Sequence, residues 1–177
     1  MQNDPLNLLL TEHEIIAGAK NVIAAMDRLW TRNPETYERA LGELLAFFAA
    51  YSDGYHHRKE EIVLFPELRS HPGFYAHDIL DELEEHHQTF RDHVAQMRRA
   101  IDEKNYDGAH ARLTRYVGEL LDHIAVENDE LFVMAGSLLS PAELERVYFR
   151  FKDVDRELGD DRKNDLERRL TEITSLL

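Results

Sequence analysis

The chain has 177 residues, no cysteine and a formal net charge of −14, and 43% of its residues are hydrophobic. This length and apolar content predict one globular domain with a sizeable core rather than a disordered chain. The acidic charge argues against nucleic acid or an anionic membrane surface as a partner, and the missing cysteines exclude disulfides, thiolate zinc sites and iron–sulfur clusters.

Neither a signal peptide nor a membrane span is visible in the sequence. The opening stretch MQNDPLNLLLTEHE lacks a basic region followed by an apolar one. No run approaches the ~18 apolar residues that a spanning helix needs. We therefore expect a cytoplasmic protein with no membrane partner.

Four long helices are predicted in chain order, because apolar residues recur at helical spacing and no segment alternates with the period of a strand. Asn33-Pro34, the break at 70–73 and the turn at 105–108 carry the residues that separate helices. The expected helices run from about residue 5 to 30, from 34 to 68, from 75 to 104, and from the turn at 105–108 to 135.

A C-terminal helical extension follows these four helices. Ser140-Pro141 opens it, with Glu143 placed as in a capping box, and 159–161 divides it. Four long helices with short turns pack best as an antiparallel up-down bundle. The sequence thus predicts an all-α fold, with a four-helix bundle over 1–138 and an extension over 139–177 that packs on the same domain.

Two segments repeat a histidine and a glutamate four residues apart. HHRKEEIVLF contains His56 and Glu60, and HIAVENDELF contains His123 and Glu127, each pair at the same offset from Leu-Phe. Residues at i and i+4 share one face of a helix, roughly 6 Å apart. Both pairs interrupt apolar stripes, where an unpartnered imidazole or carboxylate would cost several kcal/mol. Something must satisfy them.

Single histidines on the other two helices fall at a similar depth. Counted from the predicted turns, His13 lies at the level of His56, and His86 at the level of His123, within about 8 Å at 1.5 Å per residue. All four helices therefore contribute to one layer. Its six predicted members are His13, His56, Glu60, His86, His123 and Glu127.

Four imidazoles and two carboxylates form a mixed nitrogen and oxygen donor set. Such a set suits iron, manganese or zinc, whereas calcium takes oxygen alone. Six donors with two carboxylates able to bridge suit two ions better than one. The competing interpretation is a buried hydrogen-bond network without metal. A ferritin-like site uses Glu-x-x-His on paired helices, whereas the repeated pairs here have the reverse order and a longer spacing. A zinc protease needs His-Glu-x-x-His, which is absent from the sequence.

The motifs together resemble the hemerythrin-like, or HHE cation-binding, family over about residues 5–136. The resemblance implies a four-helix bundle around a non-heme di-iron centre with an oxo or hydroxo bridge. It further implies that His13 and His56 bind one iron, that His86 and His123 bind the other, and that Glu60 and Glu127 bridge them. Phe90 and Asn128 stand where oxygen-carrying members have histidine and aspartate, which puts reversible oxygen carriage in doubt.

Several neighbouring residues receive lesser roles. The pair His57 and Glu61 is expected to be peripheral, because a shift of one residue turns a side chain by ~100° on a helix. His87 and His93 flank the site on the third helix and could support its ligands from outside, but a surface position is the main expectation for both. Core packing is the main expectation for three tyrosines that are also candidate ligands or hydrogen-bond donors near the site: Tyr51, Tyr55 and Tyr116.

Two classes of function follow from the resemblance. The leading hypothesis is a di-iron protein that binds or reacts with oxygen, nitric oxide or peroxide, in sensing, stress response or iron handling. Peroxide- or nitric oxide-directed enzymatic turnover at the same centre stays open. The alternative is a regulatory module in which the metal is structural and the C-terminal helices, residues 141–177, bind a protein partner.

Overall fold

The computed structural model describes residues 4–176, and every regular element within them is helical, so the predicted all-α class is confirmed. In the labels below, α marks α-helices and η marks π-helices. The elements are α1 (Pro5–Ala17), α2 (Ala19–Ala25), α3 (Leu29–Arg32), α4 (Pro34–Phe47), η1 (Phe48–His57), η2 (Glu60–Leu64), α5 (Phe65–Ser70), α6 (His77–Asp102), α7 (Tyr106–Val126), η3 (Glu127–Leu131), α8 (Phe132–Leu138), α9 (Pro141–Leu158) and α10 (Asp160–Leu176).

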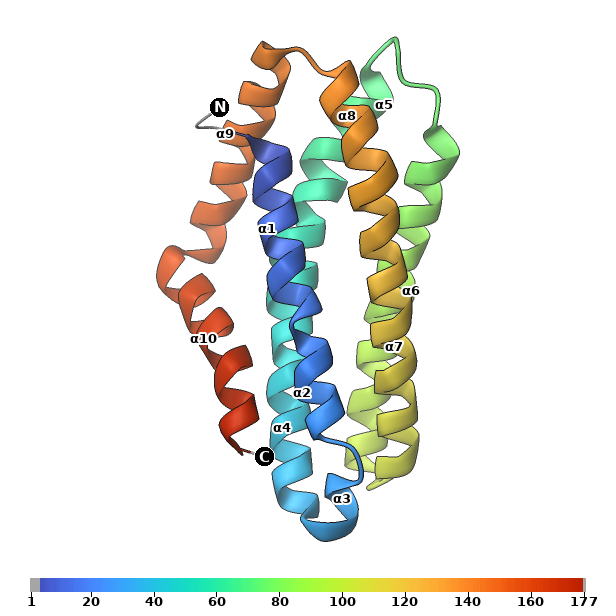
Figure 1. Ribbon diagram of the computed structural model, residues 1–177, viewed down its shortest axis with the longest axis vertical. Helices are drawn as coiled ribbons and strands as arrows, with labels where there is room; N and C mark the ends of the chain where they lie inside the picture. The colour runs from blue at the N-terminus through green and yellow to red at the C-terminus, as the bar shows by residue number, and fades with distance from the viewer. Residues whose placement is uncertain (1–3, 177) are drawn as a thin grey trace.

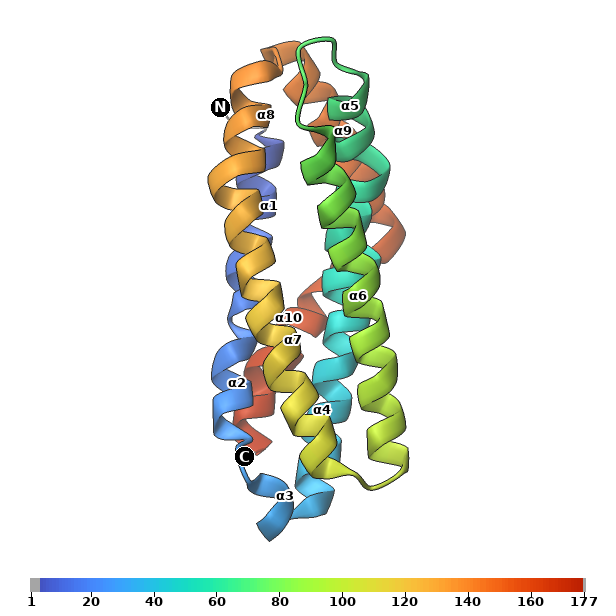
Figure 2. The ribbon, with the colours of Figure 1, turned by 90° about the vertical axis from the view of Figure 1, so that its right-hand side faces the viewer.

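Four long helical stretches lie side by side along the long axis of the molecule (Figures 1 and 2). They are α1 with α2, α4 through α5, α6 alone, and α7 through α8. α9 and α10 run along one outer side, where α9 contacts α1 and α10 contacts α4. None of the helices described between residues 4 and 176 combines the length and apolar character that a membrane span needs.

The predicted caps are confirmed. The Asn33 side chain accepts a hydrogen bond from the Thr36 amide at 3.1 Å, with proline at the first helical position. Ser140 and Glu143 form a reciprocal capping box at the start of α9, and Gly159 separates α9 from α10. The first stretch differs from the expected single helix, because Arg28 adopts a left-handed conformation (φ 54°) and ends it early.

The second and fourth stretches contain π-helical turns that the sequence did not predict. η1 and η2 lie on the second stretch, and η3 lies on the fourth. A π-turn closes its hydrogen bond five residues back rather than four, so each such turn accommodates one extra residue and changes which residues face the interior. All three segments coincide with the repeated His-x-x-x-Glu motifs, and short π-segments are frequent at functional sites.

Two apolar clusters fill the interior, one on each side of a polar layer. One cluster contains Ile16, Phe48, Phe90 and Leu120, and also Ile173 of α10. The other cluster combines Leu9, Leu64, Leu83 and Leu131 with Phe151 of α9. The histidines and glutamates of the motifs lie along the chain between the residues of these clusters. Apolar packing above and below therefore holds the polar layer in place.

Candidate functional site

Four buried side chains from three helical stretches form what we call the mixed group: His13, His56, Glu60 and Glu127. Each offers one donor atom, and these atoms all lie within 4.8 Å of one another. None of the four residues is more than 2% exposed. His13 comes from α1, the next two from the π-helical region of the second stretch, and Glu127 from the start of η3.

Three buried imidazoles form the adjoining three-histidine group: His57, His87 and His123. His57 and His87 stack with ring centroids 3.9 Å apart and planes 6° from parallel. His87 Nε2 lies 3.1 Å from His123 Nε2. None of the three residues is more than 2% exposed.

The two carboxylates of the mixed group also approach the three-histidine group. Glu60 Oε1 is 3.5 Å from His56 Nε2 in the mixed group, and its Oε2 is 3.6 Å from His87 Nε2 in the three-histidine group. Glu127 Oε2 is 3.2 Å from His13 Nε2 and 3.3 Å from His123 Nε2. Each glutamate therefore approaches imidazoles of both groups.

These residues fit a bound cation. Typical ligand atoms lie about 2.0–2.2 Å from the ion that they bind. Two such atoms at right angles about the ion are about 3 Å apart, which is close to the separations between carboxylate oxygens and imidazole nitrogens given above. Among the described residues, both carboxylates and the inward nitrogens of His13 and His56 are buried without a hydrogen-bond partner. Buried polar atoms are normally satisfied, and a positive ion would satisfy all of them together.

Outer partners turn the imidazoles inward. His13 Nδ1 is 2.7 Å from Asn128 Oδ1, and His56 Nδ1 is 3.0 Å from Glu12 Oε2. Such an oxygen accepts the Nδ1 proton, fixes the tautomer and leaves Nε2 free as a donor to a metal. The third histidine held in this way is His87, whose Nδ1 lies 2.9 Å from Glu61 Oε1.

Burial suppresses charge on these groups when no cation is present. It raises the pKa of Glu127 to about 8, and it raises the pKa of Glu60 well above its ordinary value, with the Glu127 charge adding to the effect. Burial also lowers the pKa of the imidazoles, most strongly for His56, His57 and His123. Neutral imidazoles are the form that binds metal.

A family model for the hemerythrin HHE cation binding domain matches residues 4–135. The chain belongs to this family. Neither the comparison with curated proteins nor that with solved structures found a match. The site is therefore that of an HHE domain: the matched segment contains both donor groups, and its end at residue 135 lies before α9 and α10.

The expectation that His57 is peripheral to the HHE site is wrong. His57 is 2% exposed and belongs to the three-histidine group. The reason is the wide turn of η1, which brings His56 and His57 to the interior together. The second His-x-x-x-Glu pair also takes part, since Glu61 contacts the imidazole of His87. The π-helical geometry lets both His-x-x-x-Glu pairs take part in the site. The spacing of residues along the sequence does not reveal this geometry.

On α6 the structure places His87, not His86, in the three-histidine group. The His86 side chain is 40% exposed and meets the site only through a 3.4 Å contact between its Nδ1 and that of His123. The apolar positions 83, 90 and 97 leave either histidine possible. The same seven-residue spacing joins Ile79 to His86 and Leu80 to His87. The burial of Leu80 in the structure separates the two histidines, and the sequence carries no signal that does so.

The three candidate tyrosines lie around the HHE site in different settings. The Tyr51 hydroxyl donates to Glu167 of α10 at 2.9 Å. Tyr55 lies beneath Lys59, whose Nζ is 3.7 Å from the ring centroid. Tyr116 packs edge-on against Phe48, and burial raises the pKa of its phenol far above the usual range. All three therefore take part in core packing, which agrees with the main expectation for them.

A buried ion network joins the HHE site to α9, and no sequence pattern predicts it. Lys59 is fully buried, and its Nζ lies 2.5 Å from Glu12 Oε1 and 2.7 Å from Asp155 Oδ1. The other Glu12 oxygen contacts His56. Burial raises the pKa of Glu12 despite the opposing charge of Lys59. For Asp155 burial acts in the same direction, but hydrogen bonds from Lys152 and Lys59 outweigh it and lower the pKa.

Proposed function

We propose that the protein is a cytoplasmic non-heme di-iron protein that binds or reacts with a small ligand such as oxygen, nitric oxide or peroxide. The position of the two glutamates carries this proposal, because Glu60 and Glu127 each approach imidazoles of both donor groups. A carboxylate between two sets of imidazoles suits a bridge between two ions. The four long stretches would then form the antiparallel bundle that encloses them.

Five imidazoles and two carboxylates suit iron as one of the cations that accept both nitrogen and oxygen ligands, and the family is one of cation-binding domains. Iron, when bound, supplies the redox chemistry and the affinity for a small ligand. The chain holds the donors in place through Asn128, Glu12 and Glu61, and the flanking apolar clusters keep water from the layer. The mixed group supplies two imidazoles, whereas the three-histidine group supplies three. An ion beside the mixed group would therefore have more room for a ligand.

The alternative role as an interaction module gains less support. Most apolar residues of α9 and α10 already pack into the two interior clusters, as Phe151 and Ile173 show, whereas Phe149 of α9 is exposed. Those faces are therefore occupied within the chain itself.

Iron content and spectra test the proposed function. We expect close to two iron atoms per chain by elemental analysis after expression with ample iron. We also expect the absorption spectrum of the anaerobic ferrous protein to change on exposure to oxygen or nitric oxide. A single zinc ion per chain, with no iron uptake by metal-free protein, would rule the proposal out.

Adjacent histidines on α6 provide a matched test of the donor set. His87→Ala should lower the iron content to one atom per chain or less, because His87 is fully buried and its Nε2 faces His123 and Glu60. His86→Ala should retain the full iron content. His57→Ala should behave like His87→Ala. Retention of two irons by His87→Ala together with loss by His86→Ala would show that the ligand on α6 has been misassigned.

A further inference from the structure

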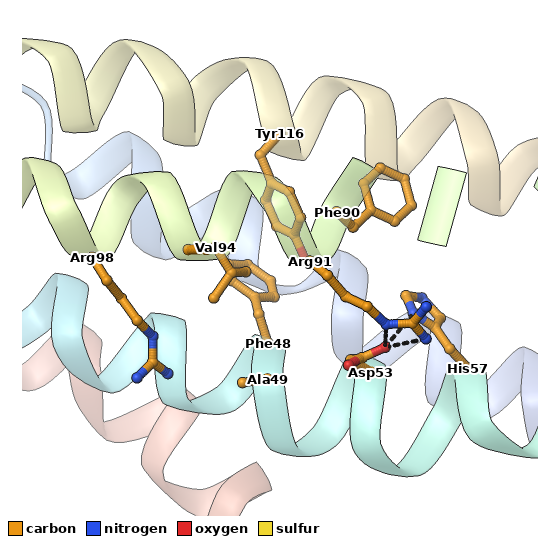
Figure 3. Close-up of a pocket in the computed structure, with 10 residues that line it drawn as sticks. Phe48, Ala49, Asp53, His57, Phe90, Arg91, Val94, Arg98 and Tyr116 are labelled. Carbon is orange, nitrogen blue, oxygen red and sulfur yellow. Dashed lines mark hydrogen bonds and ion pairs between the residues drawn. The ribbon is translucent and has the colours of Figure 1, made fainter. Parts of the chain in front are cut away.

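A cleft opens between α6 and η1 and leads to the three-histidine group (Figure 3). Its volume is about 230 Å³. Phe48, Phe90 and Tyr116 form its apolar wall and are buried, and His57 lies at its inner end. We call it the arginine-rimmed cleft, because Arg91 and Arg98 lie along its edge.

Two polar groups face this apolar space without a partner. Figure 3 shows the Tyr116 hydroxyl pointing into the cleft from α7, and it forms no hydrogen bond with any described residue. Tyr116 is itself 1% exposed. His57 Nδ1 is also without a hydrogen bond among the described residues, since the nearest carboxylate oxygen, on Asp53, is 3.7 Å away. The tyrosine hydroxyl is therefore available to a ligand in the cleft, and the His57 Nδ1 is a buried atom of the kind that normally has a partner.

The two arginines of the rim differ in their pairing. Arg91 is already satisfied, because its guanidinium donates to Asp53 at 2.7 Å and to Glu61 at 2.6 Å. Arg98 forms no ion pair with any described residue. A second hollow adjoins it on the side of α9 and α10 and brings Arg162 near, together with Arg58, whose ion-pair partner Glu157 lies 2.6 Å away. In a chain of net charge −14, this end of the cleft is a local concentration of positive charge.

The size of the cleft exceeds that of a diatomic ligand. A cavity of about 150 Å³ binds benzene, which corresponds to about 25 Å³ for each non-hydrogen atom. On that scale the cleft accommodates about nine non-hydrogen atoms. Oxygen or nitric oxide would leave most of it unfilled.

We propose that the arginine-rimmed cleft binds a small amphipathic anion. Its apolar body lies against Phe48, Phe90 and Tyr116, and its carboxylate or phosphate head pairs with Arg98. The Tyr116 hydroxyl donates to a polar atom of the ligand. The ligand thereby reaches the edge of the three-histidine group at His57. The cleft is formed by the chain alone, so binding of the anion does not depend on iron. Only the effect of the anion on the iron centre rests on the proposed function, which this site deepens.

Calorimetric titration with phenylacetate tests the proposal on the iron-loaded full-length protein. We expect saturable binding with a Kd on the order of 0.1–1 mM, as suits a ligand of about ten non-hydrogen atoms. Neutral phenylacetamide should bind about fivefold more weakly, and acetate should not bind measurably. Phenyl phosphate should bind comparably to phenylacetate. No saturable binding of either aromatic anion below about 10 mM would overturn the proposal.

Variants locate the binding. Arg98→Gln should weaken phenylacetate about fivefold and leave phenylacetamide unchanged, whereas the control Arg99→Gln, the exposed next residue of α6, should change neither. Ala49→Phe, which adds bulk to the wall, should abolish binding of both. Circular dichroism checks that each variant is folded. Equal phenylacetate affinity in the Arg98 and Arg99 variants would overturn the assignment.

A repeat with metal-free protein separates the cleft from the iron proposal. We expect phenylacetate to bind there with an affinity within about threefold of that for the iron-loaded protein, because Arg98 and the aromatic wall are unchanged. In the iron-loaded protein the bound anion should shift the absorption of the iron centre, since the cleft ends at His57. Binding without iron in the protein would support the cleft even if the di-iron proposal failed, and absence of binding in both forms would overturn it.

Discussion

Replacing Lys59 with methionine is expected to lower the free energy of unfolding by about 3–5 kcal/mol, the usual cost of removing one partner from a buried ion pair. The side chain is fully buried and lies between the carboxylates of Glu12 and Asp155. Without the ammonium group, two carboxylates remain buried with less compensation. In a protein of this size the melting temperature should fall by roughly 10 °C.

The neighbouring residue is a matched control for this variant. Arg58 pairs with Glu157 at the surface, where both side chains are about half exposed or more. Arg58→Met removes the same formal charge but should cost less than about 1 kcal/mol, because water screens exposed pairs. Thermal melting followed by circular dichroism compares the two variants. Similar losses of stability in both would contradict the buried network.

The loss in Lys59→Met should also depend on pH. Burial already raises the pKa of Glu12 in the folded protein, and removal of Lys59 raises it further. Above the ordinary pKa of 4.5, the folded variant holds a proton that the unfolded chain has released, so its stability falls as pH rises. The difference from the parent protein should be smaller at pH 5 than at pH 8.

Removal of iron is the second change with a large expected effect. A ligand that binds only the folded state stabilises it by about 4 kcal/mol at a thousandfold excess over its dissociation constant. We therefore expect metal-free protein to melt roughly 10 °C below the iron-loaded form. Most of the helix content should remain, because the apolar clusters on both sides of the polar layer do not depend on the ion.

The effect of iron should grow with pH. Burial raises the pKa of Glu127 to about 8, so below that value the metal-free protein holds a proton that the cation must displace. The difference in melting temperature between the two forms should therefore increase from pH 6.5 to 8. Melting curves at matched protein concentration measure it. Equal melting temperatures in verified metal-free and iron-loaded samples would mean that the donors satisfy one another without an ion.

Much of the fold was predictable from the sequence because its signals are local. Caps at Asn33 and Ser140, the break at Gly159 and the period of the apolar residues depend only on neighbours along the chain. Five of the six candidate donors lie in the two donor groups for the same reason. Whether they bind two irons stays a prediction.

The errors at the site are displacements by one residue. His57 falls outside the predicted site because a uniform α-helix turns its side chain away from that of His56, and His87 falls outside because the spacing on α6 fits two histidines equally well. The π-turns of η1 and η2 change which residues face the interior, and a count of helical spacing along the sequence assumes α-helical turns throughout. The contact of Lys59 with Asp155 joins residues 96 positions apart (155 − 59). No spacing rule predicts a contact of that range.

The contact between Lys59 and Asp155 also has a consequence for transplanting the domain. The family match ends at residue 135, yet Asp155 and Glu167, which receive hydrogen bonds or ion pairs from Lys59 and Tyr51, lie beyond it. A graft of residues 4–135 into another protein would uncover the side of the second stretch that α9 and α10 cover, and would leave the Lys59 ammonium group with one carboxylate partner instead of two. The donors therefore need more of the chain than the family segment, residues 4–135, to keep their arrangement.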